Sequence, residues 1–378
     1  MSKLRAVVIS ADMLTPYGKG TDACWNNILS GRTAISKLNR FNTNAFQSDY
    51  AATIDSLQYH QGDSLVMQML KSLFNNASAS IPKDAKLILA TTKGEIDLLE
   101  ESIFDKTAEM PDCSLGCLSK KIAALAGIKD AGIAVSAACA SSAAAIARAA
   151  AMIHSRRSDC VLVVACDSVT EFVFSGFSSL MALDKFTARP FDKGRKGLSL
   201  GEAAAFVLIM SETRAKQERR EIIGEIAGWG LSDDAHHMTG PSRESEGLIL
   251  AIKKAMKAAS VAKSEIGFIS AHGTGTVYND AMEMKAFHSV FNDKKIPVYS
   301  IKGGIGHTMG AAGIIETIIA MKSLKERTVP PTVNLKDVDG DARGWVSPQS
   351  CAAAGGKAAL LTNAGFSGIN AALVINLP

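Results

Sequence analysis

One of the seven cysteines stands where an apolar strand is expected to turn into a helix. The segment Ala134–Ser142 reads AVSAACASS, which places Cys139 between a short apolar run and an alanine-rich helical stretch. Unpaired backbone N–H groups and the helix dipole favour an anion at a helix N-terminus, and such a position increases the thiolate fraction of a thiol. Cys139 is therefore a candidate nucleophile. The alternative is a small buried side chain, which describes most free cysteines.

His272 ends a second apolar run and is followed by a loop of glycine and threonine. The sequence Ile269–Asp280 reads ISAHGTGTVYND. Its glycines let a backbone approach a ligand closely, and the hydroxyls of Thr274 and Thr276 suit a polar ligand. Ligands of parallel α/β sheets bind beyond the carboxyl ends of the strands. The pattern therefore favours a functional role for His272 over that of a core histidine.

A third apolar run leads through Lys302 and a glycine-rich turn to His307, beside the start of an expected helix. The glycine spacing matches neither the dinucleotide fingerprint nor the phosphate-binding loop. A helix N-terminus disfavours imidazolium, so a neutral ring there can donate an N–H group to a developing oxyanion. The residues alone leave open whether His307 does this or only caps its helix.

The turn Gly365–Gly368 reads GFSG and follows a strand near the C-terminus. Its backbone N–H groups can form an oxyanion hole, and Phe366 can screen a cavity. By itself the sequence is also that of an ordinary turn.

One cysteine and two histidines at strand ends suit acyl transfer through a thioester. The cysteine accepts the acyl group, and the two histidines donate hydrogen bonds to a carbonyl as it becomes an enolate. This set favours carbon–carbon bond formation over hydrolysis, because a protease-type cysteine needs one histidine as base and would leave the second idle.

The elements that must position these residues alternate between strands and helices. In the first part of the chain, helical patterns at Asp63–Phe74 and Ser141–Ser155 separate apolar runs typical of buried parallel strands. These runs are Ala6–Ser10, Lys86–Thr91, Gly132–Ser136, Val161–Cys166 and Ala204–Met210. The charged segment 211–221 has no apolar face and is expected to be a surface connection.

The same order of elements then starts again. Strands are expected at Ile222–Trp229, Gly267–Ala271, Pro297–Ile301, Ala358–Thr362 and Ala372–Asn376, and helices at Glu244–Ala259, Asn279–Phe291 and Gly310–Lys325. The chain is therefore expected to fold as two related α/β halves, residues 1–212 and 222–378, with the site at their shared interface.

Composition excludes several classes of protein. The 378 residues are 47% hydrophobic with a net charge of +4, which argues against disorder and against a nucleic-acid partner. No apolar run reaches the roughly 18 residues of a membrane span, and the N-terminus is not that of a signal peptide. An odd number of cysteines without a signal favours free thiols in the cytoplasm. Cys113 and Cys117 lack a nearby Cys/His pair, so no metal site is expected.

These motifs resemble those of a β-ketoacyl-[acyl-carrier-protein] synthase, a decarboxylating condensing enzyme of the thiolase superfamily. The resemblance covers essentially the whole chain. It rests on six segments in family order: the start VVISADMLTPYGKG (7–20), the nucleophile motif ACASS (138–142), the segment SDDAHHMTGP (232–241), the first histidine motif HGTGT (272–276), the motif KGGIGHTMGAAG (302–313) and the gating loop GFSG (365–368).

The resemblance implies a role for each matching residue. Cys139 would accept the acyl group, and His272 and His307 would bind the malonyl thioester carbonyl and support decarboxylation. Lys302 and Glu316 would hold the electrostatics of the site. Phe366 would gate the acyl pocket, and the N–H groups of Cys139 and Phe366 would form the oxyanion hole. The hydroxyls of Thr274 and Thr276 would contact the phosphopantetheine arm.

The resemblance also implies a fold and partners. The expected fold is the thiolase fold, a five-layered α-β-α-β-α sandwich. The product would be 3-oxoacyl-carrier protein, in fatty acid or polyketide and polyene-type biosynthesis, and no cofactor is expected beyond the phosphopantetheine of acyl carrier protein. A homodimer or a heterodimer with a sister subunit is usual in the family. Membrane insertion is not expected.

The resemblance also implies a function for a cluster of basic residues. Arg189, Arg195 and Lys196 would steer an acidic carrier protein to the pantetheine entrance. The alternative is a structural loop whose arginines pair with its own aspartates.

The sequence departs from the family at two places. Ser367 replaces a usual glycine in the gating loop, and residues 40–120 are shorter than in typical members. The acyl chain length and the identity of the partner subunit therefore stay open.

Two related functions compete with this interpretation. A chain-length-factor subunit pairs with an active synthase but lacks the nucleophile, whereas Cys139 is present here. A thiolase-type acyltransferase would use a second cysteine as base in the C-terminal loop, which here reads NAGFSG. Cys351 lies before the preceding strand instead.

Overall fold

The first half of the chain forms one half of a large mixed sheet. The computed structural model describes residues 4–59, 62–75, 81–104, 111–292, 294–353 and 355–378. Helices α2 (Leu65–Phe74) and α4 (Leu115–Ala126) pack their apolar sides on the outer face of this half-sheet. In sheet order its strands are β6 (Ile133–Val135), β5 (Lys86–Ala90), β7 (Cys160–Asp167), β9 (Ala203–Ser211) and β1 (Ala6–Thr15).

The second half repeats this arrangement. Helices α8 (Glu246–Ala259) and α9 (Val277–Phe291) cover the outer face of its half-sheet. In sheet order its strands are β12 (Val298–Tyr299), β11 (Ile266–Ser270), β15 (Ala358–Ala364), β16 (Ile369–Asn376) and β10 (Gly224–Asp233).

The two halves share one pattern of strand directions. The first three strands of each order are parallel, and the last two pair antiparallel. A short antiparallel pairing of β1 with β10 joins the half-sheets. The repeat of element order expected from the sequence is therefore present in the topology.

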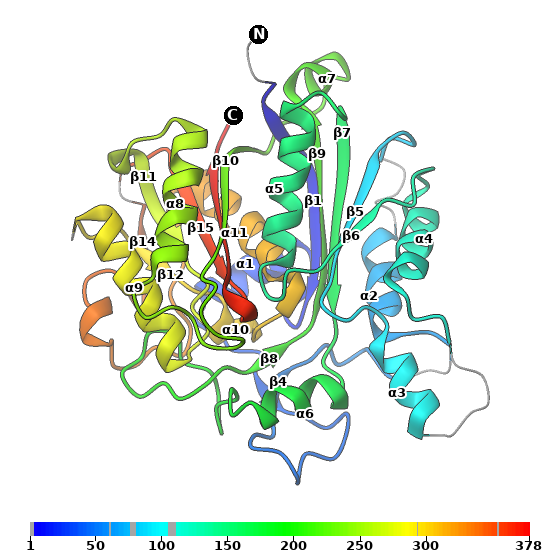
Figure 1. The fold of residues 1–378 in the computed structure, drawn as a ribbon, viewed down its shortest axis with the longest axis vertical. Helices are drawn as coiled ribbons and strands as arrows, with labels where there is room; N and C mark the ends of the chain where they lie inside the picture. The colour runs from blue at the N-terminus through cyan, green and yellow to red at the C-terminus, as the bar shows by residue number, and fades with distance from the viewer. Residues whose placement is uncertain (1–3, 60–61, 76–80, 105–110, 293, 354) are drawn as a thin grey trace.

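Two helices fill the space between the half-sheets. Figure 1 shows α5 (Ser141–His154) and α11 (Ala312–Glu326) in the centre, with α8 and α9 on one side and α2 and α4 on the other. Both central helices are buried along most of their length, and their apolar side chains form one core with both half-sheets. Alanine dominates α5, so its backbone can approach the strands closely. The layers run α-β-α-β-α, as expected.

Two expectations about the strands and their connection were wrong. Ala6–Ser10 and Ala204–Met210 were expected in parallel strands, but β1 and β9 run antiparallel to each other and β9 runs antiparallel to β7. Helices cover both faces of this sheet, so its strands are continuously apolar whatever their direction. The segment 211–221 contains the short helix α7 (Glu212–Gln217), capped by the Ser211 hydroxyl, with Ala215 buried beneath it.

The remaining elements are four helices and six short strands within the described residues. Four helices are α1 (Thr21–Leu29), α3 (Ile96–Phe104), α6 (Glu171–Ser179) and α10 (Lys302–Ile305). Short strands are β2 (Gly18–Lys19), β3 (Ser36–Lys37), β4 (Tyr50–Ala52), β8 (Leu200–Gly201), β13 (Thr328–Val329) and β14 (Cys351–Ala352). Within the described ranges, no helix combines the length and apolarity needed to cross a bilayer.

Candidate active site

Cys139 lies on a strained elbow just before α5. The preceding residue, Ala138, has a φ of 47°, a region that L-residues rarely adopt. The Ser141 hydroxyl fixes the elbow, because it donates to the carbonyl of Ala138 and accepts from the N–H of Ala137 at 2.9 Å. A Cβ at Gly365 would approach the Cys139 nitrogen to 3.3 Å, so the gating turn packs directly against the nucleophile.

The thiol of Cys139 is held protonated at neutral pH. Only 6% of the residue is exposed, and burial raises the pKa of the thiol to about 11. The cations of Lys93 and Lys302 and the backbone N–H of Phe366 pull the pKa of the Cys139 thiol back down. The N-terminus of α5 acts in the same direction, since its partial positive charge stabilises an anion.

His307 follows α10 and presents one ring nitrogen to the cavity. Its Nδ1 accepts the N–H of Met309 at 3.2 Å, so the neutral ring carries its proton on Nε2. The Nε2 atom is buried and has no hydrogen-bond partner among the described residues. Burial and the cations of Lys302 and Lys93 place the pKa of His307 well below 6.5. Both roles left open by the sequence are therefore present. The ring accepts the N–H of Met309 at the start of the next helical turn, and its Nε2–H is available as a donor to a ligand.

His272 lies at the end of β11 and is held through its backbone. The N–H groups of His272 and Gly273 each donate to the Glu283 carboxylate at 2.7 Å. The amide of Asn363 lies 3.4 Å from Nδ1 of the ring. Burial, Lys302 and His307 place the pKa of His272 well below 6.5. The rings of His272 and His307 lie 5.1 Å apart, edge to face, and both are neutral.

A buried ion pair links both sides of the site. The Nζ of Lys302 binds the Glu316 carboxylate and donates to the His272 carbonyl oxygen at 2.6 Å. The Asn363 amide donates to the other Glu316 oxygen at 2.6 Å. Both charged side chains are only 1% exposed. Such a pair stays buried only where further hydrogen bonds satisfy both groups, and this network supplies them.

Three of these supporting residues were missed from the sequence. Asn363 directly precedes the gating segment, and Asp280 and Glu283 open α9 just after the His272 loop. Asp280 accepts the N–H groups of Thr274 and Gly275, and burial raises the pKa of Glu283 to about 7. The only signal in the sequence was two acids at i and i+3 after the loop.

The glycines of the His307 segment serve packing rather than phosphate binding. A Cβ at Gly310 would lie 2.6 Å from the Asp167 carboxylate, which accepts the Gly310 N–H at 2.7 Å. A Cβ at Gly313 would lie 2.6 Å from the backbone nitrogen of Ala143 in α5. The two central helices therefore meet at glycine.

The three reactive groups open into one cavity of about 450 Å³. One ligand atom each from Cys139, His272 and His307 lies within 4.8 Å of the others. Sulfur and imidazole also suit zinc, so the expected absence of a metal stays a prediction. Besides these three, the lining includes Thr274, Thr276, Lys196 and Phe366.

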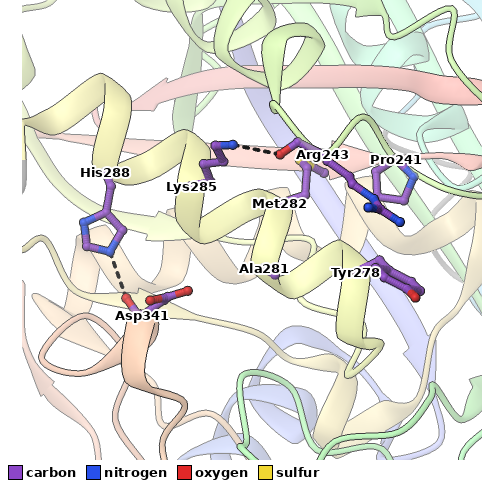
Figure 2. Close-up of a pocket in the computed structure, with 8 residues that line it drawn as sticks. All are labelled: Pro241, Arg243, Tyr278, Ala281, Met282, Lys285, His288 and Asp341. Carbon is purple, nitrogen blue, oxygen red and sulfur yellow. Dashed lines mark hydrogen bonds between the residues drawn. The ribbon is translucent and has the colours of Figure 1, made fainter.

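Two further cavities adjoin this one. Phe366 lines both the main cavity and a second one of about 370 Å³, which also reaches Cys139. The third, of about 380 Å³, shares Pro241 and Tyr278 with the mouth of the main cavity. Figure 2 shows Arg243 and Lys285 beside it, with the Lys285 ammonium donating to the carbonyl of Arg243.

The basic cluster divides into buried and exposed members. Arg195 is buried, and its guanidinium pairs with Asp339 at 2.5 Å. The expectation that Arg195 is a surface docking residue was therefore wrong. Arg189 donates to the carbonyl of Gly194 and lies near Asp184 and Asp192, which fits the structural alternative. Lys196 is exposed at the cavity mouth.

Comparison with known proteins shows the family of the chain. The 3-oxoacyl-[acyl-carrier-protein] synthase 2 of Vibrio cholerae is 30% identical over 370 residues, which cover 89% of each chain. Models of the beta-ketoacyl synthase N-terminal and C-terminal domains match residues 90–215 and 223–336. The chain belongs to the β-ketoacyl synthase family.

Two further members show how far the β-ketoacyl synthase likeness extends. The 3-oxoacyl-[acyl-carrier-protein] synthase 2 of Vibrio harveyi is 28% identical over 409 residues, covering 99% of each chain. The solved ishigamide ketosynthase/chain length factor superposes with a TM-score of 0.90 at 26% identity and covers all of both chains. The fold is the thiolase fold that this family shares.

The site argues against the thiolase-type alternative within this superfamily. Cys351 is exposed on β14 and does not line the cavity that contains Cys139. The groups beside Cys139 are two neutral imidazoles instead of the second cysteine that a thiolase would use as base. The presence of Cys139 itself argues against a chain-length-factor subunit.

Proposed function

We propose that this chain is a β-ketoacyl-[acyl-carrier-protein] synthase that extends an acyl group by decarboxylative condensation. The observation that carries the proposal is the convergence of one thiol and two neutral imidazoles, all within 4.8 Å, in a buried cavity. Hydrolysis or thiolase chemistry would leave one of the two imidazole donors without a role.

The first half-reaction transfers the acyl group. The Cys139 sulfur attacks the thioester carbonyl of acyl carrier protein, the new carbon–sulfur bond forms, and the pantetheine thiol leaves with the cysteine proton. The N–H groups of Cys139 and Phe366 stabilise the oxyanion of the tetrahedral intermediate. The Phe366 N–H already faces the Cys139 sulfur, where it favours the thiolate.

The second half-reaction forms the carbon–carbon bond. The malonyl carbon–carboxylate bond breaks, carbon dioxide leaves, and the electron pair forms an enolate. The Nε2–H groups of His272 and His307 donate to the enolate oxygen. Neutral rings suit this step, because the donor keeps its proton throughout. The enolate carbon then attacks the acyl-cysteine carbonyl, and the Cys139 thiolate leaves as the 3-oxoacyl product forms, two carbons longer.

The proposed substrates arrive on acyl carrier protein, as the names of the curated relatives indicate for those proteins. Thr274 and Thr276 line the main cavity, where their hydroxyls would bind the phosphopantetheine arm. No cofactor of the enzyme's own enters these steps. The free cysteines suit a reducing compartment such as the cytoplasm, and the pathway would be fatty acid or polyketide and polyene-type synthesis.

A second synthase-type subunit, identical or related, would cover the edge strand β6. Ile133 on this strand is 43% exposed, and Phe172, which lines the 370 Å³ cavity, is 56% exposed. Unpaired strand edges invite pairing with another chain. A molar mass in solution near twice 39.8 kDa, or a stable complex with a sister subunit, is expected.

The two half-reactions can be tested separately. Intact-mass spectrometry after incubation with acyl carrier thioesters should show one acyl group on the wild type and none on Cys139→Ala. His272→Ala and His307→Ala should keep self-acylation but lose malonyl decarboxylation by about a hundredfold or more, the scale of a lost oxyanion donor. His154→Gln, at the far end of α5, is the control. Acylation of Cys139→Ala, or decarboxylation surviving both histidine changes, would reject the proposal.

A further inference from the structure

The 370 Å³ cavity beside Cys139 contains a lysine that the proposed chemistry does not use. Its lining is otherwise mostly apolar, with Phe172, Phe177, Leu180 and Met309 among its members. The polar exceptions are Ser179 on α6 and the pair Lys93 and Thr92, which come from the loop between β5 and α3.

The loop that carries Lys93 is fixed by a buried carboxylate. Asp167 accepts the N–H groups of Thr92 at 3.0 Å and of Lys93 at 3.3 Å, and the Thr91 hydroxyl at 2.9 Å. The same carboxylate holds Gly310 in the segment after His307. One buried anchor therefore positions both Lys93 and the catalytic histidine segment, so the place of Lys93 relative to the nucleophile is set by the fold.

The ammonium of Lys93 is only partly satisfied. It donates to the Thr92 hydroxyl at 3.0 Å and lies 5.9 Å from the centre of the Phe177 ring. None of the ion pairs found in the described part of the chain includes Lys93. An ammonium has three donors, so two remain for a ligand, and the Thr92 hydroxyl can add a third.

An ammonium in this position decides which acyl groups fit. A saturated alkyl chain in the cavity would strip water from this half-buried cation without replacing its hydrogen bonds. An oxygen on the acyl chain would replace that water and accept from Nζ. The apolar remainder of the lining still favours carbon around that oxygen.

We infer that Lys93 makes this synthase selective for acyl groups that carry a hydrogen-bond-accepting oxygen beyond the thioester, as in oxo-, hydroxy- or carboxyacyl chains. The inference rests on the proposed function and narrows its substrate class. The nearness of the cation to the nucleophile supports it, since Lys93 also lowers the pKa of Cys139. Lys93 is thus a specificity residue of the acyl-loading step.

The test compares three pantetheine thioesters of nearly equal shape: glutaryl, 5-oxohexanoyl and 5-methylhexanoyl. Small thioesters keep carrier docking out of the measurement. The rate of acylation of Cys139 is followed by intact mass for the wild type, Lys93→Met and Lys93→Arg. Lys185→Met is the matched control, because Lys185 also lies 5.9 Å from a phenylalanine ring but is exposed and lines none of the three cavities.

The wild type and Lys185→Met should load one or both oxygenated groups at least about tenfold faster than 5-methylhexanoyl, a difference of one charge-assisted hydrogen bond. Lys93→Met should bring the ratio near one while 5-methylhexanoyl still loads onto Cys139, which also shows that the variant is folded. Lys93→Arg should keep the preference. The glutaryl and 5-oxohexanoyl arms distinguish a carboxylate from a neutral oxygen.

Equal loading of all three groups by the wild type would overturn the inference. So would a uniform slowing of all three in Lys93→Met, because Lys93 would then act only on the thiolate. Both results leave acylation of Cys139, and hence the proposed function, intact. No acylation by any thioester would instead overturn the proposed function and this inference together.

Discussion

At the residue scale, the three reactive side chains of the site are held in their uncharged forms. Burial keeps the Cys139 thiol protonated and both histidines neutral at pH 7. Two neutral rings can each donate from Nε2 without losing a proton, which suits an enolate. The cysteine must instead lose its proton on attack, and Lys302 and the N-terminus of α5 supply positive potential for that step.

The pKa of Cys139 predicts a steep pH dependence of its reactivity. Because that pKa is about 11, the thiolate fraction rises about tenfold for each pH unit between 7 and 10. Alkylation by iodoacetamide should follow this rise, measured as the mass added to wild type beyond that added to Cys139→Ala. A rate that levels off near pH 7 would mean that the cations outweigh burial and hold a stable thiolate.

At the element scale, the gating turn depends on one strained residue. Ser367 has a φ of 69°, in the left-handed region that glycine adopts without cost. Its N–H donates to the carbonyl of Met238 at 2.6 Å, which ties the turn to the loop at the cavity mouth. The oxyanion donors are backbone groups on either side of the cavity, so the side chain at position 367 affects how the turn moves rather than what it binds.

The strain at Ser367 predicts opposite effects of two substitutions. Ser367→Gly should raise the free energy of unfolding by up to about 1 kcal/mol, because the left-handed conformation costs a side chain about that much. Ser367→Val should lower it, since a β-branched side chain suits this region least. Thermal unfolding measures both. Self-acylation should persist in Ser367→Gly, and a loss of stability in that variant would contradict the assignment of strain.

At the scale of the whole molecule, the charged surface around the cavity mouth differs from the basic cluster seen in the sequence. Arg195 is an internal ion-pairing residue, while Lys196 lines the mouth and Arg243 lies beside the neighbouring cavity. Both exposed cations flank the entrance that a pantetheine arm would use. An acidic carrier protein would meet these two charges rather than the buried arginine.

Charge reversal tests this docking surface. The double change Lys196→Glu with Arg243→Glu should raise KM for acyl carrier substrates several-fold at low salt with little change in kcat, and added salt should shrink the difference. Lys263→Glu, before β11 at the strand end opposite His272, is the control. Binding that is unaffected at low salt would remove these residues from the docking surface.

Arg195→Gln should instead lower the stability of the fold, because it leaves Asp339 unpaired.

The sequence by itself determined which residue types stand at the strand ends, and the order of strands and helices in two halves. Those features are local: a hydrophobic run, a turn and a reactive side chain lie within about fifteen residues of one another. Cys139, His272 and His307 could be selected in this way, and Lys302 through the resemblance of its motif to the family's. The fold places all four together.

Only the tertiary structure decided the direction of β1 and β9, the burial of Arg195 and the supporting contacts of Asn363. In a sheet covered on both faces, parallel and antiparallel strands have the same apolar sequence pattern. The local sequence also does not distinguish a buried arginine from an exposed one, because its aspartate partners come from distant segments. The same holds for Lys93, which precedes Cys139 by 46 residues and reaches its cavity only because β5 and β7 are neighbours in the sheet. Packing between remote segments, which no local pattern encodes, placed these groups.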